Sequence, residues 1–188
     1  PAVSFHGSAD ALHWGTAYRV GHLDADGAVD LGGASDTPWR IAADARALAL
    51  GKAAADRLTL RVDGARSRHD AVLAVQGAGL ELRTRLVGGL VADAGPLQWR
   101  GQIVALDITG RYPLALAAPA ELAWHGSQLK LTDARGSLAG GSFALRDLSW
   151  DAGRLSSSGE FNAVPVAPIL AAAGIDQRLR STLTVDGR

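Results

Sequence analysis

Four of the five tryptophans in this chain of 188 residues occur in one short pattern, in which leucine precedes tryptophan by two positions and glycine follows within three. The pattern stands at residues 12–15, 97–101, 122–126 and 148–153. Residues two apart in an extended chain point to the same side, and a nearby glycine permits a sharp reversal into the next strand. The pattern therefore predicts a repetitive all-β chain whose function is built on the surface of a sheet.

The composition excludes several classes of protein. Hydrophobic residues make up 47% of the chain and charged residues 20%, so the chain can bury a core and is not expected to be disordered. Lysine plus arginine and aspartate plus glutamate number 19 each, which argues against electrostatic attraction to nucleic acid. Cysteine is absent, so disulfides and thiolate metal sites are excluded.

The ends of the chain indicate a piece of a longer protein. The sequence has no methionine, no secretory signal pattern and no apolar run near the ~18 residues that span a bilayer. Its closing segment, 183–188, breaks off just after a strand and a turn signal. We therefore expect a segment excised from a longer chain.

Alternation of polar and apolar residues predicts strands along much of the chain. The clearest segments are 57–64, 80–86, 102–110, 114–117, 128–132, 142–146 and 182–185. The first of them ends in Asp63-Gly64, a hairpin signal. In the third, Val104, Leu106 and Ile108 are expected to share one face. The spacing of these segments is close to the ~8–12-residue rhythm of antiparallel sheets.

The sequence predicts few helices. Segment 168–174 begins with proline and ends with glycine, which allows one short helix near 166–174. Segment 42–57 is rich in alanine, and for it a helix and a strand with a loop both remain open. The long helical patterns of parallel βαβ winding are missing. No linker divides the chain, so residues 1–188 are expected to form one continuous segment.

The search for catalytic chemistry finds no complete motif. Gly51-Lys52 lacks the first glycine and the Ser or Thr of a phosphate loop, and Gly136–Gly140 lacks one residue of a nucleophile elbow. The histidines form no i, i+4 pair and no tight cluster with carboxylates; they are His6, His13, His22, His69 and His125. We therefore predict a protein that is not an enzyme and needs no cofactor.

A calcium loop is the one metal site at which the sequence hints. Asp24, Asp26 and Asp30 place three carboxylates around Gly27, but the spacing and the distal glutamate of an EF-hand loop are missing. An Asp-Gly turn is the favoured interpretation of this stretch. We expect no metal ion, and a chelator should leave the melting temperature unchanged.

Several sequence blocks follow one another in a fixed order. Gly64 and His69 precede a strand, Leu97-Gln98-Trp99-Arg100-Gly101-Gln102-Ile103 begins another, and Tyr112-Pro113-Leu114 leads to Pro119-Ala120. The passages 141–145 and 155–166 continue the series. Together these blocks resemble the TamB family, large periplasmic members of the AsmA-like bridge group of Gram-negative bacteria. Residues 55–188 carry most of the resemblance, and residues 1–50 fit more loosely through Pro38–Ile41.

The resemblance implies a fold and a role. The fold is a curved, repetitive, largely antiparallel or meandering β-sheet that forms a taco or half-pipe with an apolar interior. About 12 to 16 stacked rungs would give a groove of roughly 55 to 75 Å. The implied partners are phospholipid or another acyl-chain ligand, an outer-membrane barrel of the TamA type, and nascent outer-membrane β-strands. The implied location is the periplasm, in a protein anchored in the inner membrane.

The alternating apolar residues are the candidate groove residues, and in a closed fold they would simply be core. They are Leu58, Leu60, Val62, Leu80, Leu82, Val104, Leu106, Ile108, Leu114, Leu116, Leu129, Leu131, Phe143, Leu145, Leu183 and Val185. The main alternative is a secreted repetitive β adhesin or passenger domain with a closed core. An enzyme on a β-sandwich lacks a polar constellation, and a membrane barrel needs longer strands and aromatic girdles.

Overall fold

The computed structural model describes residues 2–15, 18–30, 36–50, 53–77, 79–91 and 97–165. These residues form a single 12-stranded antiparallel sheet, and no helix occurs among them. The strands are β1 (Ala2–Trp14), β2 (Tyr18–Asp30), β3 (Pro38–Leu50), β4 (Ala53–Ala65), β5 (His69–Gly77), β6 (Leu80–Val91), β7 (Gln98–Thr109), β8 (Leu114–Leu116), β9 (Ala120–His125), β10 (Gln128–Leu138), β11 (Gly141–Asp151) and β12 (Arg154–Asn162). The prediction of a curved antiparallel all-β fold is confirmed, and the helix allowed near 166–174 lies outside the described residues.

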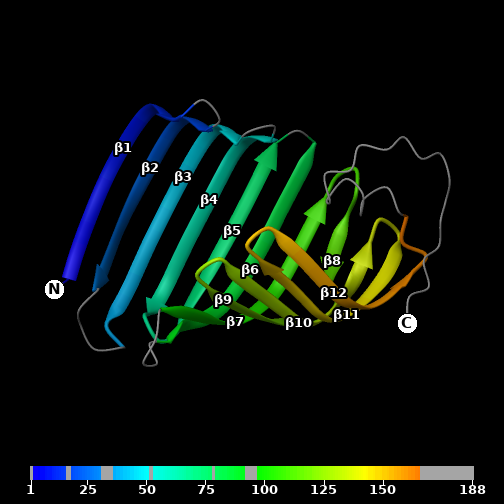
Figure 1. Cartoon of the computed structure of the whole chain (residues 1–188). Helices are drawn as coiled ribbons and strands as arrows, with labels where there is room; N and C mark the ends of the chain where they lie inside the picture. The colour runs from blue at the N-terminus through cyan, green and yellow to red at the C-terminus, as the bar shows by residue number, and fades with distance from the viewer. Residues whose placement is uncertain are drawn as a thin grey trace.

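Apart from the position shared by β8 and β9, strands that are neighbours in the sheet are also neighbours in the sequence. The order runs from β1 to β8 and then through β10, β11 and β12, while β9 pairs with both β7 and β10. The three-residue β8 and the short β9 therefore share one strand position between β7 and β10. Beyond this broken position, β10–β12 turn away from the direction of β1–β7, so that the sheet curls into a half-pipe (Figure 1).

Most of the observed strands are longer than the alternating segments, with β8 as an exception, and two turn predictions are wrong. Segment 57–64 lies within β4, whose turn falls at 66–68 and not at Asp63-Gly64. Asp26-Gly27 is not a turn either, because Gly27 pairs with neighbours on both sides in β2. Segment 42–57 is resolved as strand on each side of residues 51–52, and it contains no described helix.

Left-handed residues interrupt several strands and change which side chains face the same way. Ala11, Ala47 and Asp133 have φ near +50°, a conformation that L-residues adopt at a cost of about 1–2 kcal/mol. In β3, Ala45 and Leu48 are both buried although they are three residues apart. The alternation therefore shifts by one position at Ala47, and the strand keeps its apolar side chains on one face.

The most densely buried part of the sheet lies in β8–β12. Ala120, Ala134, Phe143 and Leu145 form a core cluster, each no more than 8% exposed. The apolar side chains packed against this cluster are Leu114, Leu116, Leu131, Leu138, Leu148 and Phe161. Among the described residues, however, no large side chain is fully buried. The curled sheet therefore leaves much of its apolar face in contact with solvent.

Candidate functional site

The strand register defines an inner face of the sheet, because residues paired across neighbouring strands point to the same side. One row of paired residues crosses most of the molecule. It contains Ala9, Leu23, Ala45, Leu58, Val75, Leu82, Ile108, Leu114 and Leu138. Parallel rows repeat this apolar composition on either side. We call the surface that these rows form the trough.

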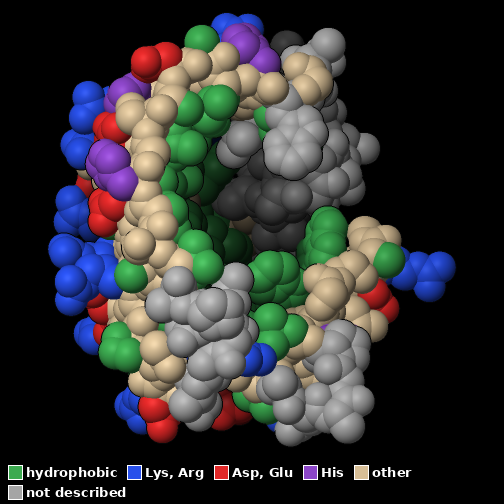
Figure 2. Space-filling model, turned by 90° about the vertical axis from the view of Figure 1, so that its left-hand side faces the viewer, with side chains coloured by type: hydrophobic (Ala, Val, Ile, Leu, Met, Phe, Trp, Pro, Cys, Tyr) green, Lys and Arg blue, Asp and Glu red, His purple; other side chains and the backbone are tan. Residues whose placement is uncertain are grey.

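Charged residues lie outside the trough. No Asp, Glu, Lys or Arg of the described strands occupies a position in the inner rows. Asp56, Asp133 and Arg146 stand at kinks or a bulge and have no register partner. Figure 2 shows the result: a hollow lined by hydrophobic side chains, with Lys, Arg, Asp and Glu gathered on the outside.

Within the part of the chain that the structure describes, the trough is open and is not a closed core. Trp124, Trp150 and Leu155 are 58%, 47% and 59% exposed, and register pairs join them through Leu129 into one row. Leu80, at the opposite end of the strands, is 44% exposed. Because a folded monomer rarely exposes a contiguous apolar surface of this kind, the trough is the candidate binding surface.

Most of the predicted groove residues occupy inner rows. They are Leu58, Leu60 and Val62 on β4, Leu80 and Leu82 on β6, Leu106 and Ile108 on β7, Leu114 and Leu116 on β8, Leu129 and Leu131 on β10, and Phe143 and Leu145 on β11. Val104 does not share a row with Leu106, because it is the extra residue of a bulge. The expected face of β7 is therefore wrong at that position. Leu183 and Val185 lie outside the described residues.

Sequence reasoning missed the contribution of β1, β2, β3 and β5. Phe5 and Ile41 lie in the inner row of Val62, and Leu73 lies in that of Leu60. The runs in β1 and β2 contain Gly and Ala at inner positions, so hydropathy alternates weakly there. The pairing of β3 and β5 with β4, and of β1 and β2 with β3 in turn, is the information that no single segment contains.

A histidine and two tryptophans cover one end of the trough. His69 is 8% exposed and stacks on Trp39, with 5.8 Å between the ring centroids. Its Nδ1 lies 3.0 Å from the carbonyl oxygen of Ala65, and the indole N–H of Trp99 donates to its Nε2 at 2.8 Å. The tautomer with a proton on Nδ1 satisfies both contacts. Both ring nitrogens of the buried His69 side chain therefore have hydrogen-bond partners.

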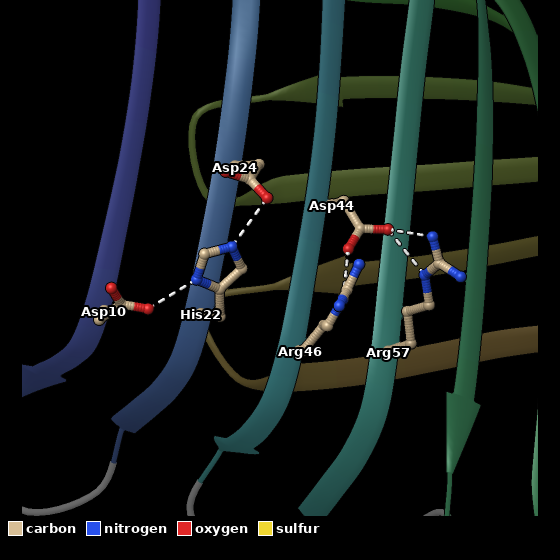
Figure 3. Close-up of polar contacts among 6 residues, drawn as sticks. All are labelled: Asp10, His22, Asp24, Asp44, Arg46 and Arg57. Atoms are coloured by element: carbon tan, nitrogen blue, oxygen red, sulfur yellow. Dashed lines mark hydrogen bonds and ion pairs between the residues drawn. The ribbon is translucent and has the colours of Figure 1, made fainter.

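The outer face carries ion pairs across neighbouring strands. Asp44 accepts hydrogen bonds from Arg57 at 2.7 Å and from Arg46 at 3.0 Å (Figure 3). The Arg57 contact, followed by the Arg46 contact, lowers the pKa of the Asp44 carboxyl. Asp70 accepts hydrogen bonds from Arg85 in the same way, and its pKa is also lowered. These exposed pairs favour solvation of the outer face and contribute little stability.

His22 lies between two carboxylates on the same outer face (Figure 3). Its Nδ1 is 2.6 Å from Asp10 and its Nε2 is 2.8 Å from Asp24. The hydrogen bond to Asp10 and then the one to Asp24 raise the pKa of His22, and the contact with His22 lowers that of Asp24.

Among the described residues no three His, Asp or Glu side chains are grouped to hold a metal ion. Within the same ranges no helical segment has the length and hydropathy of a membrane crossing.

The fold and the trough define a class: a half-pipe β protein with an apolar interior and a charged exterior. The family profile described as TamB, N-terminal domain, matches residues 1–152. The chain therefore belongs to the TamB family. No curated protein and no solved structure matches it. As a family, TamB proteins are non-enzymatic bridge and assembly proteins that are anchored in the inner membrane, extend into the periplasm and work with a TamA-type partner.

Proposed function

We propose that this chain is a periplasmic segment of a TamB-like protein whose trough holds or conducts phospholipid acyl chains between the inner and outer membranes. The observation that supports this most is the inner face itself. Its rows contain no charged residue of the described strands, and yet no large side chain of the described residues is fully buried. A closed-core adhesin, the main alternative, needs these apolar side chains to be covered by a second sheet.

The energetics favour an acyl chain as the occupant. Each methylene removed from water contributes about 0.8 kcal/mol, so about ten methylenes lying in the trough gain roughly 8 kcal/mol. When an acyl chain binds, no charged side chain in the inner rows of the described strands has to be desolvated. We extend the inner-membrane anchor and periplasmic location of the family to the protein that contains residues 1–188, and we take these residues as one continuous segment.

A second candidate function is help in the assembly and secretion of outer-membrane proteins and autotransporters. The trough supports this role as well, because its inner rows contain no charged residue of the described strands. An extended segment whose alternate side chains are apolar can lay its apolar face on such a surface. A nascent outer-membrane strand, delivered to a TamA-type barrel, is the occupant that fits it.

The test is the phospholipid content of the full-length protein purified from membranes in mild detergent. We expect co-purifying phospholipid by mass spectrometry, and at least fivefold less of it in Leu60→Asp, because a carboxylate then stands in the inner row. Ala74→Asp is the matched control, since Ala74 lies on the outer face opposite Arg83. Phospholipid no higher than in an unrelated protein purified in parallel would contradict the lipid function.

A further inference from the structure

The trough is not uniform along its length. In β8–β12, Phe143 and Leu145 are each 8% exposed and pack with Ala120 and Ala134, which have no exposed surface. In β1–β7 the buried residues of the described part are Ala45, Leu48, His69 and Gly89, and they form no comparable cluster. Inner-row residues of β4–β7 such as Leu60 and Leu106 are only half-buried.

The change occurs at the broken strand position. β8 ends after three residues, and the chain re-enters the sheet as β9 after residues 117–119. Ala117 then donates its N–H to the carbonyl of Arg135 at 2.8 Å, which ties the break to β10. Beyond this break the sheet curls most strongly (Figure 1). The cluster is built from β9, β10 and β11 of this part, and apolar residues of β8 and β12 pack against it. The apolar residues of this cluster are consequently each other's partners, whereas Trp124, Trp150 and Leu155, at one end of β9, β11 and β12, stay exposed.

We propose that β1–β7 is the acyl-binding part of the trough and that the β8–β12 cluster is a stop at which a bound acyl chain ends. This inference rests on the proposed lipid function. Seven strands at a spacing of about 4.8 Å span roughly 29 Å, whereas one leaflet of a hydrocarbon core that is ~30 Å thick accounts for about 15 Å. The open part is therefore long enough for one acyl chain without the space that the cluster fills. Passage beyond the stop requires the cluster to open.

The experiment is site-specific photo-crosslinking in the full-length protein, in cells fed an alkyne-bearing fatty acid so that crosslinked phospholipid can be labelled. The photoreactive residue replaces Leu60 in the open part, Leu131 beside the cluster, or Val72, which is exposed on the outer face. We expect strong labelling at Leu60 and at least tenfold less at Leu131 and Val72. A second substitution, Phe143→Ala, removes the centre of the cluster and should raise labelling at Leu131 at least fivefold.

The outcomes separate the two proposals. Labelling at Leu131 equal to or above that at Leu60 overturns the stop while leaving the lipid function intact. No labelling above Val72 at either position overturns the lipid function itself. Folding of each variant is checked by its protease resistance, and Leu122, which pairs with Leu131 in β9, replaces that position if the Leu131 variant is degraded.

Discussion

His22 is held by a carboxylate at each ring nitrogen, an arrangement that only the doubly protonated imidazole satisfies as a donor on both sides. We expect its pKa to lie above the ordinary value of about 6.5. Because the folded-state pKa is raised, the stabilisation is fully present below about pH 6.5 and is lost as the pH rises through the folded-state pKa. An NMR titration of the histidine rings, assigned with His22→Gln, measures this value.

Asp10→Asn is the control for that titration. It removes the larger of the two influences on His22, so the pKa should fall toward the ordinary value while Asp24 keeps part of the shift. Identical titration curves for His22 in the wild type and in Asp10→Asn would show that the contact does not persist in solution.

Gly101 and Gly7 both lie in inner rows but should respond oppositely to a side chain. A Cβ at Gly101 would stand 2.2 Å from the carbonyl oxygen of Val87 and 2.7 Å from the indole of Trp99, whereas one at Gly7 meets nothing within 4 Å. We expect Gly101→Val to lower the free energy of unfolding by about 1–3 kcal/mol. Gly7→Ala should leave it unchanged or raise it by up to about 1 kcal/mol. Chemical denaturation of both variants checks this, and equal effects would mean that Trp99 does not cover Gly101.

At the scale of the strand, substitution by glycine should change the free energy of unfolding in opposite directions at two alanines of β3. Ala47 has φ +51°, where glycine relieves a cost of about 1–2 kcal/mol, against an entropic loss of about 0.5–1 kcal/mol. Ala47→Gly should therefore stabilise the chain slightly. Ala43→Gly, in ordinary extended conformation in the same strand, should destabilise it by about 0.5–1 kcal/mol. Denaturant midpoints of the two variants decide this, and a loss of stability in both would mean that Ala47 carries no strain.

The same kinks explain which elements could be predicted from the sequence. Alternation in β4 and β6 marks inner residues correctly, because these strands keep one phase over most of their length. In β3 and β10 the phase shifts at Ala47 and Asp133, and neither residue type signals a positive φ as glycine does. The bulge that displaces Val104 depends on pairing between β6 and β7, a contact that no local pattern contains.

The glycines of the Leu-x-Trp pattern could be predicted only in part, because local sequence does not show which strand lies beside each of them. Gly15, Gly126 and Gly153 lie in turns, as the pattern predicts. Gly101 instead lies within β7, where the indole of Trp99 covers it. A glycine after a tryptophan thus serves either a turn or a close contact, and only the neighbouring strand decides which.

For the whole molecule, apolar surface that the trough leaves open for a ligand is surface that does not stabilise the fold. Eleven strand positions at about 4.8 Å give a sheet roughly 48 Å across in the described residues, shorter than the roughly 55–75 Å expected. Its stability comes from β-ladders and one cluster in β8–β12, since the remaining apolar face is left half-buried. A mutation in the open part should therefore affect binding more than folding.

Leu106→Asp and Ala105→Asp test that expectation on adjacent residues of β7. Leu106 pairs with Thr84 in an inner row, and Ala105 pairs with Arg85 on the outer face. In a closed core, a buried carboxylate at Leu106 would cost several kcal/mol, enough to unfold a domain that is stable by only ~5–15 kcal/mol. In an open trough the carboxylate reaches water, so both variants should fold, with circular dichroism spectra and melting temperatures close to the wild type. Only Leu106→Asp should then fail, in the full-length protein, to restore outer-membrane integrity to a strain lacking it. Unfolding of Leu106→Asp, or equal complementation by the two variants, would contradict an open trough that acts in transport.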